Sequence, residues 1–226
     1  MRRKVALVTG CGKGIGRAIV EKLTEKYFVV GLSRTVVDLG LDYFKMIACD
    51  ISDEQQVKKR IAEIIEDFGQ VDVLVNNAGI GAFGVLEQIE SDVFKQMMDV
   101  NVQGTFLMNK YVVPHMKAAR VGHIVQIASD VSKRTFAEGS VYCASKYAQD
   151  AMTSSLRAEV REFNVKVSSI YPGLTDTHFA ASTPGEEHKQ GWLSPYDVAD
   201  AVNYILSSPK HVVVDELMIH PMSQDY

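Results

Sequence analysis

Short apolar runs and amphipathic stretches alternate along the whole chain. The apolar runs lack the in–out alternation of a half-exposed strand, which is typical of parallel strands buried on both faces. The stretches between them place apolar residues every three to four positions, as in residues 55–68, and this period indicates helices. The expected strands are Val5–Val8, Phe28–Leu32, Phe44–Ala48, Val71–Val75, His123–Ile127, Val165–Ile170 and Val212–Met218. The expected helices are Ile15–Lys26, Gln55–Phe68, Asp92–Lys117, Val141–Phe163 and Pro195–Leu206.

This alternation predicts a doubly wound α/β (Rossmann) fold, a three-layer sandwich with a mostly parallel sheet of about seven strands. We expect residues 1–226 to form a single domain, because no linker or low-complexity segment interrupts the pattern. Right-handed crossovers then put the ligand crevice at the carboxyl ends of the strands. Between Leu32 and Phe44 only about one turn of helix fits, so this flank of the sheet is expected to be thin and open.

Composition narrows the function classes. The net charge of −4 argues against a nucleic-acid partner, and no apolar stretch reaches the length of about 18 residues that a membrane span needs. The basic start, Met1–Lys4, precedes an apolar run that ends within a few residues, which predicts a first strand rather than a signal peptide. Six scattered histidines and three cysteines show no metal-ligand spacing, so we expect no metal and reduced thiols in a cytoplasmic protein.

The first strand is followed at once by the glycine-rich turn Thr9–Gly16, which opens the first helix. Glycines allow positive φ and let backbone N–H groups approach phosphate oxygens without an intervening Cβ. The helix beginning near Ile15 adds the positive end of its dipole. A tight turn without a ligand is the alternative, but four glycines are a poor choice for a plain turn because each adds unfolded-state entropy. The turn therefore predicts a pyrophosphate site.

A second group of residues has the chemistry of proton transfer. Tyr142 and Lys146 lie four positions apart in an expected helix and so share one face. A free phenol has a pKa of about 10, and a neighbouring cation, from the lysine or from an oxidised nicotinamide, is expected to favour its ionised form. Ser129 follows the strand His123–Ile127 on the side where ligands bind. A Tyr-x-x-x-Lys pair alone is weak evidence, and it gains its meaning from the glycine turn and Ser129.

Cofactor preference is predicted from the residues after the second strand. Proteins of this fold that prefer NAD place an acid there to accept from the ribose 2′-hydroxyl. In this chain no acid occurs before Asp38, whereas Arg34 stands where a 2′-phosphate needs a cation and Lys13 lies in the glycine turn. A guanidinium pairs with phosphate through two parallel hydrogen bonds. The expected cofactor is therefore NADP, as NADPH. The alternative is that Lys13 and Arg34 are ordinary surface charges.

Together these motifs resemble those of the short-chain dehydrogenase/reductase family. The resemblance covers nearly the whole chain and includes Asn76–Gly79 after a strand, Asn101, and Pro172-Gly173 followed by Thr177. It implies that Tyr142 exchanges the proton, that Ser129 orients the carbonyl oxygen, that Lys146 binds the nicotinamide ribose, and that Asn101 holds a water near the lysine. The residues expected to bind the dinucleotide are Gly10, Lys13, Gly14, Ile15, Gly16, Ser33, Arg34, Asp50, Ile51, Asn77, Ala78, Gly79, Pro172, Gly173 and Thr177. For Asn76 and Asn77, satisfying buried backbone groups is an equally good explanation.

The substrate is less well defined than the cofactor. The loop from Gly173 to about Ser194 is polar and short, which indicates an exposed site. Arg134, Phe136 and Trp192 are candidate neighbours of the substrate, although the core is the default place for the two aromatic residues. Asp130, where many relatives carry a small residue, is expected to be a solvated loop residue.

We therefore expect an NADPH-dependent oxidoreductase that reduces a small-molecule carbonyl to an alcohol, with Tyr142 as the general acid. The family branch that includes bacterial sepiapterin reductases and carbonyl reductases is the most similar. A 3-oxoacyl-carrier-protein reductase and a hydroxy-acid dehydrogenase remain open, because loops vary on a shared scaffold. A non-catalytic NADPH sensor and an epimerase or dehydratase are further alternatives. The resemblance also implies a homo-oligomer, a dimer or a homotetramer, that associates through the two long helices.

Overall fold

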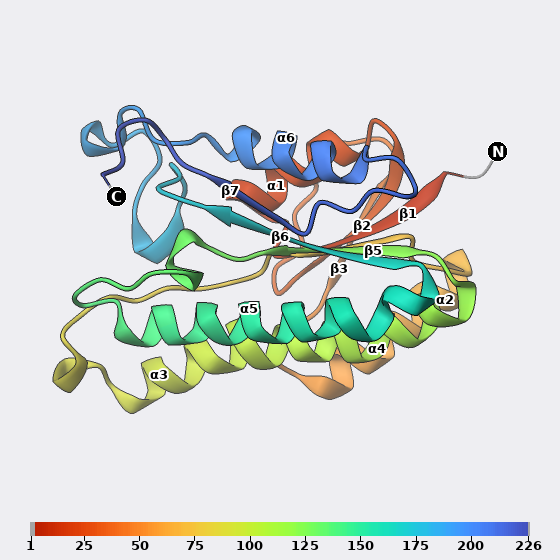
Figure 1. Ribbon diagram of the computed structural model, residues 1–226, viewed down its shortest axis with the longest axis horizontal. Coiled ribbons are helices and arrows are strands. Elements are labelled where there is room, and N and C mark those ends of the chain that lie inside the picture. Colours follow the sequence, from red (N-terminus) through yellow and green to blue (C-terminus); the bar gives the residue numbers. More distant parts are fainter. Residues whose placement is uncertain (1–2, 226) are drawn as a thin grey trace.

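The computed structural model describes residues 3–225, and a seven-stranded sheet runs through its centre (Figure 1). The strands lie in the order β3-β2-β1-β4-β5-β6-β7, and every neighbouring pair is parallel. Their bounds are β1 Lys4–Thr9, β2 Tyr27–Ser33, β3 Phe44–Ala48, β4 Val73–Asn76, β5 Gly122–Ile127, β6 Val165–Pro172 and β7 Glu216–Ile219. The chain winds outward from β1 in both directions, so the strand order reverses between β1 and β4 and opens a crevice there. The doubly wound prediction is confirmed.

Helices cover both faces of the sheet (Figure 1). Helices α1 and α6 pack together on one face, while α2, α4 and α5 cover the other. Each face has its own apolar core, because the inner strands are buried on both sides. The α-helices are α1 Gly14–Leu23, α2 Glu54–Phe68, α3 Ser91–Met97, α4 Gly104–Ala119, α5 Ser140–Val160 and α6 Pro195–Leu206. The short 3₁₀ turns are η1 Leu86–Gln88, η3 Asp130–Ser132, η4 Arg161–Phe163, η5 Phe179–Ala181 and η6 Glu187–Lys189.

The expected helix over residues 92–117 is interrupted. Between α3 and α4 the chain forms a π-helical segment, η2, at Met98–Gln103. Such segments insert an extra residue per turn and often occur at functional sites. The following Gly104 lies against Ile51, where a Cβ on the glycine would come within 2.6 Å of the isoleucine Cδ1. This close approach seats α4 beside the crevice.

The connection from β2 to β3 contains no helix. Residues 34–43 form turns and extended chain instead of the expected helical turn. The Asp38 carboxylate accepts the N–H of Gly40, which has a left-handed φ of 62°, and this local turn competes with helix formation. Val36 and Val37 are exposed, so this flank of the sheet is open, as the sequence predicts.

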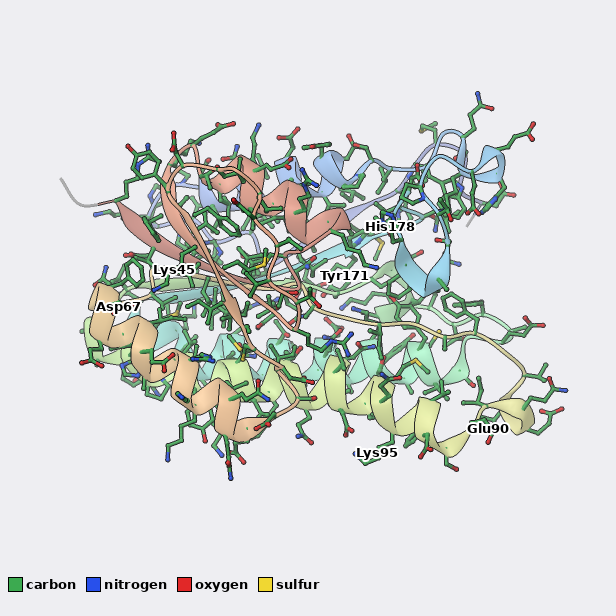
Figure 2. All side chains as sticks on the ribbon, turned by 180° about the vertical axis from the view of Figure 1, so that it is seen from behind. Lys45, Asp67, Glu90, Lys95, Tyr171 and His178 are labelled. Atoms are coloured by element: carbon green, nitrogen blue, oxygen red, sulfur yellow. The ribbon has the colours of Figure 1, made fainter. Side chains whose placement is uncertain are left out.

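The loops that follow the strands gather at one end of the molecule. In Figure 1 the segments after β4, β5 and β6 lie together at the left, where the strand arrows point. Figure 2, from behind, shows His178 at this end, far from the ion pair of Lys45 and Asp67. Within residues 3–225 no helix combines the length and apolar character needed to cross a membrane.

Candidate active site

A cleft of about 1180 Å³ opens at the carboxyl ends of the strands. This volume lies somewhat above the range of about 300–1,000 Å³ that is typical of small-molecule sites. Of the residues predicted to bind the dinucleotide, all line this cleft: Gly10, Lys13, Gly14, Ile15, Gly16, Ser33, Arg34, Asp50, Ile51, Asn77, Ala78, Gly79, Pro172, Gly173 and Thr177. Ser129, Tyr142 and Lys146 line it as well. Stretches from the ends of six strands, β1 to β6, therefore meet around one space.

The glycines of the turn have two different tasks. Gly10 has φ +67°, and a Cβ there would lie 2.7 Å from the Ala78 Cα. A Cβ on Gly16 would lie 2.2 Å from the carbonyl oxygen of Gly10, so these two positions need glycine for packing. A Cβ on Gly12 would meet only the Ser33 Oγ, at 3.6 Å. The open side of the turn therefore faces the cleft with bare backbone.

Asn77 supports this turn from β4. Its Nδ2 donates to the carbonyl oxygens of Thr9 and Gly10 at 2.9 and 3.1 Å. Thr9 Oγ1 in turn accepts the N–H groups of Asn77 and Ala78, both at 3.0 Å. Asn76 donates instead to Asn109 of α4. Asn77 therefore satisfies backbone groups and also lines the cleft, whereas Asn76 bonds a side chain and not the backbone.

The turn fits a phosphate-bearing group. The first turn of α1 contains no acidic residue, and Lys13 at its N-cap makes no side-chain cap, so the helix offers unpaired N–H groups. Lys13 and Arg34 are both exposed at the cleft, and among the described residues neither forms an ion pair. The donors available to a phosphate are therefore the Arg34 guanidinium, the Lys13 ammonium and the bare amides of the turn. No carboxylate is paired with either cation among the described residues.

Ser129, Tyr142 and Lys146 come together on the opposite wall of the cleft. Ser129 follows β5, and the other two lie one turn apart on α5. All three are buried, and the Lys146 Nζ lies 5.8 Å from the centre of the Tyr142 ring. The Lys146 Nζ donates to the carbonyl oxygen of Ile127 at 3.4 Å. The predicted shared face is confirmed.

Burial dominates the proton affinities of this pair. Loss of water lowers the pKa of Lys146 to about 8. Loss of water also raises the pKa of Tyr142 well above its ordinary value, and a hydrogen bond with Ser129 only partly opposes this. The net shift of the Tyr142 pKa therefore runs opposite to the expected lowering, because desolvation of the protein's own groups outweighs the stabilisation of the phenolate by a neighbouring cation. The phenol keeps its proton at neutral pH.

Asn101 lies behind the cleft and does not line it. It is fully buried in the π-helical segment η2. Its Oδ1 accepts the N–H of Ile80 at 2.8 Å, and its Nδ2 donates to the Ile80 carbonyl oxygen and to Ser145 Oγ at 2.9 and 3.0 Å. A Cβ on Gly79 would lie 3.4 Å from Asn101 Oδ1 and 3.6 Å from Lys146 Nζ. Asn101 thus fixes the chain segment beside Lys146, and its binding of a water stays a prediction.

Aromatic side chains form the wall beside Tyr142. Phe83 packs edge-on against the Tyr142 ring at 5.5 Å, and Phe179 lies 5.3 Å from the same ring. Phe136 lies 5.6 Å from Phe83 and is 40% exposed. Trp192 also lines the cleft, so the default assignment of Phe136 and Trp192 to the core is wrong. Phe83 was missed by sequence reasoning, since nothing marks one aromatic residue in a loop as a cleft residue.

Lys189 is a second residue that the sequence did not single out. It lies in η6, lines the cleft and is buried, with its ammonium enclosed by oxygens of the loop after β6. It donates to the Thr177 carbonyl oxygen and to Ser182 Oγ, both at 3.0 Å, and also to Thr183. Glu186, three positions before Lys189, indicates an ion pair from the sequence alone. Nothing in the sequence indicates that Lys189 is buried.

Asp130 contradicts its expected role as a solvated loop residue. Its side chain is 7% exposed and forms an ion pair with Arg134. The error arises because the segment after β7 folds back over this loop. Gln224 of this segment donates to Asp130 Oδ2 at 2.7 Å.

Among the described residues, no three His, Cys, Asp or Glu side chains are placed to hold a metal ion. Proteins that combine a doubly wound sheet, a phosphate-binding first turn and a tyrosine–lysine pair at the crevice form a class of dehydrogenases and reductases. Comparison with known proteins agrees with that class. The family model described as short chain dehydrogenase matches residues 4–188.

Individual relatives match along their whole length. An uncharacterized oxidoreductase of Staphylococcus aureus is 34% identical over 227 residues, covering 97% of each chain. A sepiapterin reductase of Chlorobaculum tepidum is 31% identical over 240 residues, with 99% of this chain and 98% of that protein covered. The structure of an alcohol dehydrogenase of the archaeon Thermococcus sibiricus, complexed with 5-hydroxy-NADP, matches with a TM-score of 0.92 and 32% identity, covering 100% of this chain and 99% of that one. The chain belongs to the short-chain dehydrogenase/reductase family of oxidoreductases.

Proposed function

We propose that this protein is an NADPH-dependent reductase that converts a small carbonyl compound to an alcohol, with Tyr142 as the general acid. The observation that carries the proposal is the convergence of Ser129, Tyr142 and Lys146 on one wall of the cleft that also holds the glycine turn. A sensor that only binds the dinucleotide has no use for these three groups on the substrate side.

The proposed chemistry follows from the burial of the site. NADPH, when bound, supplies the hydride. Tyr142 carries its proton at neutral pH, because desolvation raises its pKa, and so it is ready to donate to the carbonyl oxygen. Ser129, whose hydroxyl donates to Asp130 in this structure, turns its proton to the carbonyl oxygen when the substrate binds. The Lys146 ammonium stabilises the phenolate that remains and binds the nicotinamide ribose. Asn101 holds the chain beside Lys146 in place.

NADPH is proposed over NADH because of the charge at the adenosine end. Arg34 and Lys13 are exposed there without carboxylate partners among the described residues, and Ser33 lies beside them. The first acid after β2, Asp38, uses its carboxylate in a turn with Gly40. A 2′-phosphate gains charge-assisted hydrogen bonds in this place and meets no repulsion. The NADP analogue in the Thermococcus sibiricus structure supports the same choice.

The aromatic wall favours substrates with a flat apolar group beside the carbonyl. Phe83, Phe136 and Phe179 come from three different loops. Phe83 and Phe179 pack against the Tyr142 ring, and Phe136 packs against Phe83. Rings of this kind stack on planar groups and offer few hydrogen bonds to a carboxylate. Pteridine and aryl dicarbonyl substrates are therefore favoured over oxoacyl thioesters and oxo acids. The similarity to a sepiapterin reductase supports the same preference.

A spectrophotometric screen tests this proposal. Oxidation of NADPH and of NADH is followed with dicarbonyls, pteridines, oxoacyl thioesters and oxo acids. We expect turnover of a carbonyl substrate with NADPH, a lower catalytic efficiency with NADH, and a reversal of that preference in Arg34→Asp. Tight NADPH binding without turnover of any carbonyl would favour the sensor, and a retained NAD that does not exchange would favour an epimerase.

We also propose that the protein forms a homo-oligomer, a dimer or tetramer, through α4 and α5. Phe106 on α4 and Tyr147 on α5 are large side chains that are 49% and 42% exposed. Exposed aromatic residues on adjacent helices are typical of protein–protein contacts.

A further inference from the structure

Asp130 is a buried carboxylate with donors on both of its oxygens. It follows Ser129 directly and begins the 3₁₀ turn η3. Ser129 Oγ donates to Asp130 Oδ1 at 3.1 Å. Asp130 Oδ2 accepts from Arg134 Nε at 3.0 Å and from Gln224 Nε2 at 2.7 Å, and His220 Nε2 lies 3.5 Å away. The reductase mechanism outlined above gives this charge no task.

The C-terminal tail fixes Asp130 against the rest of the site. Gln224 uses its other side-chain atom, Oε1, to accept the N–H of Leu174 at 2.7 Å. A Cβ on Gly173 would lie 2.2 Å from that oxygen and 2.6 Å from His220 Cδ2, so the glycine makes room for the tail. The tail thus joins the loop after β5 to the start of the loop after β6.

The charge of Asp130 acts on the proton of Tyr142 through Ser129. The Ser129 hydroxyl donates to Asp130, and Ser129 also acts on the pKa of the neighbouring Tyr142 phenol. A negative charge close to a phenol disfavours its ionised form. Asp130 accordingly adds to the effect of burial and raises the pKa of Tyr142 further.

We propose that Asp130 is a positioning residue for the reaction, which holds the Ser129 hydroxyl in place until a substrate binds and keeps Tyr142 in its proton-donating form. This inference rests on the proposed function, since it assigns to Asp130 a task in the same site. A neutral residue in its place is expected to let the Tyr142 phenolate, the base for alcohol oxidation, form at lower pH, while the phenol stays protonated for reduction at neutral pH.

Other charged and titratable groups face Asp130 and Tyr142, and they decide in which direction each variant shifts the pKa of Tyr142. Lys146 lies on the Tyr142 side, and Cys143 follows Tyr142 on α5. Arg134 and His220 face Asp130, and Lys133 lines the same small pocket of about 230 Å³. Arg134 offsets part of the Asp130 charge. Removing the Asp130 charge should therefore lower the pKa of Tyr142, and removing the Arg134 charge should raise it.

The test is a pH titration of Tyr142 in charge variants. Tyrosinate absorbance is measured for the intact protein, D130N and R134Q, each minus its Tyr142→Phe counterpart, so that the difference reports Tyr142. The D130N amide oxygen can still accept from Ser129, so the change removes the charge and spares that hydrogen bond, while the amide NH₂ can no longer accept from Arg134 and Gln224. The control D67N removes an exposed carboxylate from the ion pair with Lys45 at the far end of the sheet (Figure 2).

We expect Tyr142 in D130N to ionise about one pH unit lower, and in R134Q to ionise higher, with D67N unchanged. The pH profile of alcohol oxidation by D130N should move in the same direction. A purely structural Asp130 would lower both rates without moving the titration. Because R134Q changes a partly exposed side chain, it provides the opposite-sign test if D130N folds poorly.

The outcomes separate this inference from the proposed function. Reduction of carbonyls by the intact protein, with no titration shift in either variant, would overturn the role of Asp130 alone. A titration shift of the expected sign, in a protein that reduces none of the carbonyls tested, would overturn the proposed function and leave the coupling of Asp130 to Tyr142 standing.

Discussion

At the scale of single residues, the site contains groups whose burial costs stability. Lys146 is 4% exposed, and loss of water holds its pKa at about 8, well below the ordinary lysine value. The unfolded chain therefore binds this proton more tightly than the folded protein, so the lysine destabilises the fold at neutral pH. The cost disappears as the pH rises past the ordinary lysine pKa of about 10.4.

Lys146→Met is accordingly expected to make the protein more stable and inactive. Its free energy of unfolding at pH 7 should rise by about 2–3 kcal/mol, because no ammonium is then buried. Urea denaturation at pH 7 and at pH above 10 measures this, and the gain should vanish at the higher pH. A loss of stability at pH 7 would contradict the account of the buried ammonium.

His123 predicts how stability responds to acid. It is buried beside Ser168, with Nε2 and Oγ 2.8 Å apart, and burial, assisted by Lys166, lowers the pKa of His123 to about 4. In the unfolded chain the value is about 6.5. Above pH 6.5 neither state binds the proton, and as the pH falls from 6.5 to 4 only the unfolded state gains it. Stability should therefore fall by about 3 kcal/mol over this window.

His123→Gln is expected to remove most of that loss. Its amide can still pair with Ser168 but does not titrate. Unfolding free energies at a series of pH values compare the two proteins, and only the difference between them is attributed to His123. Parallel curves for both proteins between pH 6.5 and 4 would show that another group is responsible.

At the scale of elements, the loop between β6 and α6 closes the substrate side of the cleft. Its organising group is Lys189, whose side chain is 1% exposed and pairs with Asp176 and Glu186, both at 3.4 Å. The same ammonium holds the carbonyl oxygen of Thr177. The loop has little apolar core of its own, so these polar contacts fix its shape.

Lys189→Met should loosen this loop without unfolding the sheet. Cleavage by a protease within residues 176–190 should become faster, and the affinity for NADPH should fall by about tenfold, the equivalent of about 1.4 kcal/mol. Lys210→Met, which changes an exposed lysine, is the control. Unchanged cleavage of the loop in Lys189→Met would refute its organising role.

Local signals account for the elements that were predicted well. The period of Gln55–Phe68 and the proline-led start of α6 at Pro195 located two helices almost to the residue. The π-helical segment η2 was not predictable, because its extra residue is stabilised by the contacts of Asn101 with Ile80 and Ser145. Periodicity carries no information on such long-range contacts.

In the candidate site, too, local patterns were predictable from the sequence and long-range contacts were not. The turn Thr9–Gly16 and the pair Tyr142 and Lys146 are local patterns, and the fold brings them to one cleft as predicted. Asp130 was misjudged because its burial depends on Gln224, which lies 94 positions away. The placement of a polar tail on a loop leaves no periodic or motif signal in either segment.

At the scale of the whole molecule, both long helices α4 and α5 leave aromatic groups exposed. Phe106→Glu is expected to dissociate the proposed oligomer, because a charge in the middle of an apolar contact is costly to desolvate. Light scattering or sedimentation gives the mass directly. Leu86→Glu, at an exposed position of η1, is the control and should leave the mass unchanged. An intact protein that is monomeric at all concentrations would contradict the proposed assembly.

The account of the molecule as a reductase depends on the proton of Tyr142. The most direct measurement is NADPH oxidation with the best carbonyl substrate by the intact protein and by Tyr142→Phe, with NADPH binding to both measured by fluorescence. The phenylalanine keeps the aromatic contacts with Phe83 and Phe179 but has no proton to donate. We predict unchanged NADPH binding and a kcat lower by about 10²-fold or more. A variant that retains the full rate would contradict the assignment of Tyr142 as the general acid.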